Sequence, residues 1–197
     1  MKKIVLSLGL LVGIASAANA QEVRFGLKAG VNYSTFTGGD FEDIENKIGL
    51  QAGVLANFGL SDLISIQPEV LYSQKGTQSK DDSDDKYKLN YVDVPVLIKV
   101  NAGGLFFEGG PQVGFLASAK ATDGTNDVDV KDIFNTVDFG YAVGLGYQAD
   151  SGPMIGLRYN GGINKVTKSV DTPFGTFESD ARNSAFQLYV GYTFGGK

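Results

Sequence analysis

Eight segments of this 197-residue chain alternate apolar and polar residues with a period of two. That period is typical of β-strands whose two faces meet different surroundings. The segments cover residues 23–34, 47–58, 63–75, 91–100, 105–118, 137–148, 154–164 and 185–194. Beyond residue 20 the sequence has no helical stripe, so it predicts an all-β protein.

The connections between these segments alternate in length. Short turns lie near residues 60–62, 101–103 and 150–152, and long polar loops lie near residues 35–46, 76–87, 119–133 and 166–182. An even strand number, with short turns at one end and long loops at the other, is typical of a transmembrane β-barrel. We therefore expect one domain over residues 21–197, an eight-stranded antiparallel up-and-down barrel.

The first 20 residues have the features of a cleavable signal peptide. A basic start at Lys2 and Lys3 precedes a short apolar run, and Ala-Asn-Ala before Gln21 fits a cleavage site. Removing the two lysines leaves 15 basic and 22 acidic residues, a net charge of −7. A chain this acidic is a poor candidate for binding nucleic acid, because Lys and Arg are needed to neutralise the phosphates.

Three features indicate that the apolar face meets lipid. The central apolar positions carry no charge, and a lipid-facing Lys or Arg near the bilayer midplane would cost roughly 2–4 kcal/mol. The opposite face is rich in glycine, which leaves room inside a narrow barrel. Aromatic residues gather at both ends of the apolar face: Phe25, Phe58, Phe107, Tyr147 and Tyr192 near the turns, and Tyr33, Tyr72, Phe115 and Phe186 near the loops. The alternative is a soluble, lipocalin-like barrel with an apolar lumen.

The same alternation places seven charged residues inside the barrel. They are predicted to form a lumen ionic network: Lys28, Glu69, Asp93, Lys99, Glu108, Asp138 and Arg158. If positions in the third and fourth strands pair with numbers summing to about 162, Glu69 lies opposite Asp93. Two adjacent carboxylates repel unless a cation lies between them. We expect Arg158 or Lys28 to neutralise them, as a structural plug or, alternatively, as part of an ion path.

Three prolines interrupt neighbouring strands. By the same register, Pro68, Pro95 and Pro111 lie at similar height on the third, fourth and fifth strands. Proline cannot donate a ladder hydrogen bond, and a closed barrel has no edge strand to receive it. We expect a local irregularity in the half of the wall nearest the short turns.

The sequence offers little for catalysis. It contains no histidine and no cysteine, so His-based triads and zinc sites cannot form within the chain. Acids cluster in the long loops, for example Asp81, Asp82, Asp84 and Asp85, and such clusters suit hard cations. They match no calcium-loop pattern, which favours a solvated acidic surface. We expect no enzyme activity, cofactor or metal.

Several segments resemble, in order and spacing, the PorT-like "porin family" of small outer-membrane β-barrels. They are IQPEVLYSQKG, YVDVPVLIKV, GPQVGFLASAK, DFGYAVGLGY and GLRYNGGIN. The architecture is also similar to that of the OmpA and OmpX barrels. The resemblance implies insertion into the cell outer membrane by the barrel-assembly machinery. The assembly signal would be the last strand: Leu188, Val190, Tyr192 and Phe194. The chain departs from the pattern with Gly195, Gly196 and Lys197 after Phe194.

These observations predict a monomeric, non-enzymatic outer-membrane barrel. Its expected role is at the surface or in the envelope, through four acidic extracellular loops, in adhesion, partner binding or membrane integrity. The alternatives are a narrow channel for ions or very small solutes and an accessory role in a secretion system. The sequence identifies no extracellular partner.

Overall fold

The computed structural model describes residues 23–39, 43–81, 84–172, 175–177 and 179–195. The predicted signal peptide, together with Gly196 and Lys197, lies outside this part of the chain. Eight long strands form the wall of the molecule: β1 (Val23–Thr37), β2 (Ile44–Gly59), β3 (Ile64–Ser79), β4 (Asp85–Ala102), β5 (Leu105–Asp123), β7 (Val137–Gln148), β8 (Pro153–Gly162) and β11 (Arg182–Phe194). No helix among the described residues is long and apolar enough to cross a membrane.

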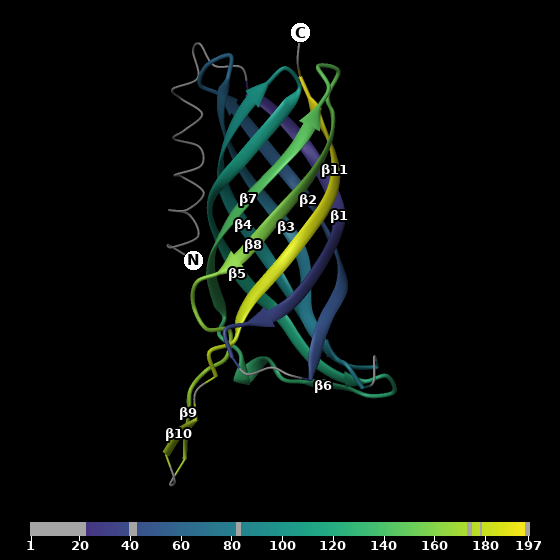
Figure 1. Cartoon of the computed structure of the whole chain (residues 1–197), viewed down its shortest axis with the longest axis vertical. Coiled ribbons are helices and arrows are strands. Elements are labelled where there is room, and N and C mark those ends of the chain that lie inside the picture. Colours follow the sequence, from purple (N-terminus) through teal and green to yellow (C-terminus); the bar gives the residue numbers. More distant parts are fainter. Residues whose placement is uncertain (1–22, 40–42, 82–83, 173–174, 178, 196–197) are drawn as a thin grey trace, which may run out of the picture.

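The eight strands close into an antiparallel barrel. Their order is β4-β3-β2-β1-β11-β8-β7-β5, and pairing of β4 with β5 completes the cylinder. The first and last strands of the barrel also pair, with Val31 opposite Leu188. Figure 1 shows the strands tilted around one axis, with the short turns at one end and the long loops at the other. The predicted fold class is confirmed.

The apolar face of the barrel points outward. The exposed fraction is 53% for Leu27, 52% for Val54 and 53% for Leu145, whereas charged residues of the opposite phase, such as Lys28 and Arg158, are buried in the lumen. A soluble barrel would shield these side chains, so the lipocalin-like alternative is wrong. Eight of the nine predicted girdle residues are also about half exposed, such as Tyr192 near the turns and Tyr33 near the loops, whereas Phe58 is less exposed. This arrangement fits a wall surrounded by hydrocarbon, with aromatic girdles at its two interfaces.

The strands continue farther into the predicted loops than the apolar pattern indicated. β2 begins at Ile44, and β5 extends to Asp123 and pairs over residues 120–122 with the short strand β6 (Asp127–Asp129). Beyond the membrane these strands need no apolar face, so the period of two no longer marks them. The long loops also contain a 3-10 helix, η1 (Lys131–Ile133), and a hairpin of β9 (Val170–Thr172) and β10 (Gly175–Phe177) that extends away from the barrel (Figure 1).

The three prolines do lie on neighbouring strands, and pairing is interrupted beside them. Pro68 is opposite Val96, after which the β3–β4 pairs resume only at Leu71. Pro95 is opposite Gln112, and the β4–β5 pairs resume at Ile98. The register is the same on both sides of each interruption. The predicted irregularity is thus a gap in pairing without a bulge, because the missing donor removes a bond but adds no residue.

Candidate functional site

The middle of the lumen is filled by an arginine that binds two carboxylates. From β8, Arg158 donates two parallel hydrogen bonds to Glu69 on β3, from Nη1 to Oε2 at 2.8 Å and from Nη2 to Oε1 at 2.9 Å. Its Nε donates to Glu108 Oε1 on β5 at 2.7 Å. Paired bonds between a guanidinium and a carboxylate fix geometry as well as charge. The Arg158 side chain therefore ties together three strands across the barrel interior.

A lysine and a tyrosine complete this central cluster. Lys28 Nζ lies 3.3 Å from Glu69 Oε2 and 3.4 Å from the centre of the Tyr189 ring. The Tyr189 hydroxyl donates to Glu108 Oε1 at 2.8 Å. Two cations thus face two anions, all of them buried. We call Lys28, Glu69, Glu108, Arg158 and Tyr189 the central plug.

A glycine makes room for the tyrosine of the central plug. A Cβ atom at Gly156 would overlap the Tyr189 ring, which lies on the neighbouring strand β11 with Gly156 directly opposite. Apolar side chains pack beside this ring toward the short-turn end, namely Leu55, Phe106 and Met154. Small residues on the wall thus let large side chains fill the narrow interior, as expected for eight strands.

The prediction that Glu69 lies opposite Asp93 is wrong. Asp93 is opposite Leu71, a displacement of two residues from the predicted register. Its cation is Lys75, whose Nζ lies 2.9 Å from Asp93 Oδ2 and 4.9 Å from the centre of the Tyr91 ring. Glu69 and Asp93 therefore belong to two separate ion clusters, and they do not form a carboxylate pair suited to acid–base chemistry.

The remaining two predicted lumen residues lie apart from the central plug. Lys99 Nζ, toward the short turns, donates to Gln148 Oε1 at 2.6 Å and lies 3.9 Å from the centre of the Phe106 ring. Asp138, toward the long loops, accepts a 2.8 Å hydrogen bond from Asn183 Nδ2. The structure thus brings together Lys28, Glu69, Glu108 and Arg158, and it separates them from Asp93, Lys99 and Asp138.

Sequence reasoning missed two residues that bind the charged ones. Lys75 has the same inward phase on β3 as Glu69, and this signal could have identified it. Tyr189 occupies an inward position on β11, between the outward residues Leu188 and Val190. The four proposed assembly residues, Leu188, Val190, Tyr192 and Phe194, all point outward and are about half exposed.

An apolar cluster closes the long-loop end of the lumen. Two loops place Phe134 and Val166 against the inward residues Leu89 and Tyr91, all buried. Backbone hydrogen bonds hold this cap, from Asn135 N to Val166 O at 2.8 Å and from Val166 N to Ala181 O at 2.8 Å. This apolar cluster therefore fills part of the lumen on the long-loop side of the central plug.

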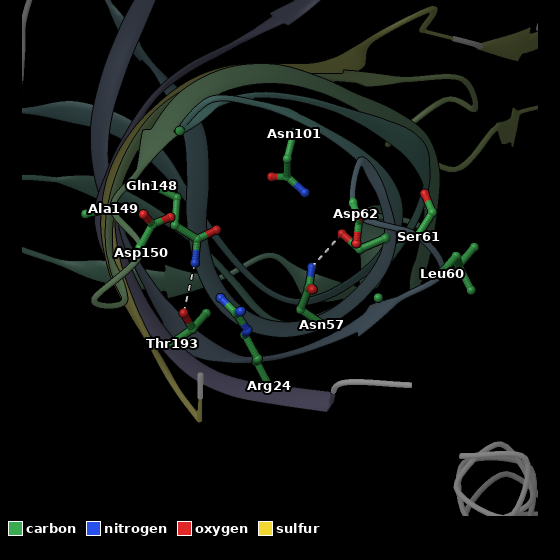
Figure 2. A pocket seen from close by; sticks show the side chains of 13 residues that line it. Arg24, Asn57, Leu60, Ser61, Asp62, Asn101, Gln148, Ala149, Asp150 and Thr193 are labelled. Carbon is green, nitrogen blue, oxygen red and sulfur yellow. Dashed lines mark hydrogen bonds between the residues drawn. The ribbon is translucent and has the colours of Figure 1, made fainter. Parts of the chain in front are cut away.

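The short-turn end is open and polar. A vestibule of about 480 Å³ is lined by residues that include Arg24, Asn57, Asn101 and Gln148, whose side chains surround the mouth of the barrel (Figure 2). Gln148 Nε2 donates to Thr193 Oγ1 at 2.8 Å. Lys99 lies next to the vestibule, since it donates to Gln148 in the vestibule lining. It is a polar recess with no histidine or cysteine to perform chemistry.

The described residues contain no group of three or more His, Cys, Asp or Glu side chains that could hold a metal ion. The described part of the lumen is a set of hydrogen-bonded ion clusters between the apolar cap and the open vestibule.

A closed eight-stranded barrel with an apolar exterior and a charged interior defines a transmembrane β-barrel protein. The chain belongs to the outer membrane protein beta-barrel domain family, whose model matches residues 19–168. It is located in the outer membrane, so the short turns face the periplasm and the long loops face the cell exterior. The finer PorT-like assignment stays a prediction.

Two solved structures of other bacterial proteins have the same fold. Neisserial surface protein A is 16% identical, with a TM-score of 0.57 over 86% of this chain and 97% of that one. Ail, the attachment invasion locus protein of Yersinia pestis, solved with the heparin analogue sucrose octasulfate, is 14% identical. Its TM-score is 0.50 over 88% of this chain and 99% of Ail. None of the curated proteins compared with the chain matches it.

Proposed function

We propose that this protein is a closed, non-enzymatic outer-membrane barrel that acts through its extracellular loops rather than as a channel. The central plug carries this proposal. Arg158, Glu69, Glu108 and Tyr189 join β3, β5, β8 and β11 across the lumen, and each is buried. Passage of an ion would require these charge-assisted hydrogen bonds to break inside a low-dielectric interior, where they are strong.

The apolar cap supports the same proposal. Phe134 and Val166 close the extracellular end through backbone hydrogen bonds between loops. A solute that entered the periplasmic vestibule would therefore meet two successive barriers, one ionic and one apolar. The alternative, a narrow channel, is favoured by the polar vestibule of about 480 Å³.

Planar-bilayer recording separates these two functions. A heat-dependent gel shift first establishes that the protein in the preparation is folded. We then expect the barrel to show no unitary current steps. Reproducible steps from folded protein would support the channel and contradict the proposal. A triple variant, R158A/Y189A/F134A, shortens side chains in both the central plug and the apolar cap and should produce steps if it folds.

For the extracellular face we propose a cationic partner. Each of the four predicted loops contains more acidic than basic residues, and Asp81, Asp123 and Asp129 are exposed. A negative surface attracts positive partners and repels a polyanion such as the one bound to Ail. Folded protein should therefore retain a polylysine peptide and not sucrose octasulfate, and the reverse preference would contradict this choice.

Insertion by the barrel-assembly machinery, with β11 as the recognised strand, is also part of the proposal. It rests on the outward apolar row of Leu188, Val190, Tyr192 and Phe194. We further propose a monomer, because the wall closes on itself and β1 and β11 pair within one chain.

A further inference from the structure

A small cavity lies inside the barrel on the extracellular side of the central plug. Its volume is about 10 Å³, close to one water-sized sphere. Polar side chains from three strands face it: Asp138 from β7, Asn160 from β8 and Asn183 from β11. All three are more than nine-tenths buried. The cavity therefore suits one small guest without its hydration shell.

Each of these three side chains has an oxygen that accepts no hydrogen bond from the described residues. The atoms are Asp138 Oδ1, Asn160 Oδ1 and Asn183 Oδ1. The amide nitrogens are already used, since Asn160 Nδ2 donates to Gln112 Oε1 at 2.7 Å and Asn183 Nδ2 donates to Asp138 Oδ2 at 2.8 Å. The bond to the Asp138 carboxylate, which can only accept, fixes which end of the Asn183 amide is the oxygen. Three buried acceptors thus lack a donor, which is costly unless a guest binds them.

The charge around the cavity is also unbalanced. In the central plug, Lys28 and Arg158 match Glu69 and Glu108. In the extracellular half, Lys47 and Lys75 are buried together with Asp93 and Asp138, but Lys47 does not line the cavity. Lys75, the one cation among the described residues lining the cavity, is bound to Asp93. One carboxylate, that of Asp138, is left without a cationic partner among the described ion pairs.

Glycines create the space for this guest. Gly140, Gly161 and Gly162 form one wall of the cavity. A Cβ atom at Gly162 would lie 3.5 Å from Asp138 Oδ1 and 3.1 Å from the backbone of Asn183. A residue larger than glycine at position 162 would therefore occupy part of the space in front of Asp138 Oδ1.

We propose that this cavity binds a small, hard monovalent cation such as Na⁺, held by Asp138, Asn160 and Asn183. Carboxylate and amide oxygens are the ligands that hard cations prefer. One positive charge balances Asp138, whereas a divalent ion would leave an excess charge next to Lys75. The bound cation joins β7, β8 and β11 beneath the extracellular cap.

Thermal unfolding of the folded barrel in detergent micelles tests this site. The midpoint, followed by far-UV circular dichroism, should rise with NaCl but not with choline chloride at equal ionic strength. The rise should be roughly 3–6 °C at a sodium concentration about ten times the dissociation constant. The D138N variant should lose the difference between the two salts, and the control D81N, at an exposed loop acid, should keep it.

Two further measurements do not depend on how well D138N folds. G162A narrows the cavity without changing a charge and should also lose the sodium-specific rise. Wild-type protein should broaden the ²³Na NMR signal, and G162A should not. Equal midpoints in both salts for the wild type would overturn the proposal. A thermal midpoint that changes with pH but not with sodium would also overturn it, because a proton would then neutralise Asp138.

Discussion

Arg158 and Glu69, 89 residues apart in the sequence, form a two-bond ion pair across the lumen with N–O distances of 2.8 and 2.9 Å. Neither residue is adjacent to the other in the wall, because β8 and β3 are separated by β11, β1 and β2. The ion pair therefore spans the interior. It connects β3 and β8, which the backbone hydrogen bonds of the wall do not join directly.

Replacing Arg158 with methionine should strongly destabilise the barrel. Glu69 and Glu108 would remain buried without their main cation, and breaking a buried pair in this way costs about 3–5 kcal/mol. Urea unfolding in micelles measures the loss, and R182M, at an exposed arginine on β11, should change the free energy of unfolding by less than about 0.5 kcal/mol. Equal stabilities for the two variants would contradict the assigned role.

Lys75 and Asp93 should behave as a coupled pair. K75M leaves the Asp93 carboxylate buried and unpaired, so we expect a loss of about 3–5 kcal/mol. Adding D93N removes the unpaired charge of Asp93 and should recover part of the lost free energy of unfolding. A double-mutant cycle measures the coupling by urea unfolding. Additive effects of the two substitutions would mean that the ion pair, 2.9 Å long, contributes nothing.

The extracellular end should respond to acid at Asp127. Hydrogen bonds from the Thr122 hydroxyl and the ammonium groups of Lys120 and Lys88 lower the pKa of Asp127 to about 2, from an ordinary 3.8. Because the folded-state pKa is the lower one, the contribution to stability is present above pH 3.8 and is lost as pH falls through about 2.

Carboxyl-carbon NMR measures this titration directly. We expect a midpoint near 2 for Asp127 and lower protection factors against amide exchange in β6 as the pH falls between these values. D127N should show the low protection factors at all pH values. A midpoint near 3.8 would show that these hydrogen bonds do not persist in solution.

Phe194 should matter for assembly more than for stability. F194A shortens the last outward residue of β11, and we expect less folded protein in isolated outer membranes, judged by unboiled gels. F139A removes an equally exposed aromatic side chain from β7 (52% for Phe194, 53% for Phe139) and serves as the control. Equal folded fractions for the two variants would argue against a special role for the last strand.

Alternation predicted the inward or outward direction of the charged residues but not the register between strands. A slip of two residues leaves every side chain on the same face. Glu69 and Asp93 therefore point inward in either register, and only the loop between β3 and β4 decides which residues become neighbours. That loop is polar and carries no periodic signal, so the partner of Asp93 could not be predicted.

Contacts across the lumen were partly predictable. A buried carboxylate needs a cation, and this requirement indicated Arg158 or Lys28 for Glu69 before the geometry was known. The apolar cap was not predictable, because Phe134 and Val166 lie in polar loops without a period. Their burial depends on where the barrel rim holds the ends of β7 and β8.

The interrupted pairing beside Pro68 and Pro95 has a mechanical consequence. Three successive seams of the cylinder, β2–β3, β3–β4 and β4–β5, lack pairs at the height of these prolines. Heat or lateral pressure from the bilayer should therefore separate β3 and β4 from their neighbours first, so that unfolding of the barrel begins at these two strands.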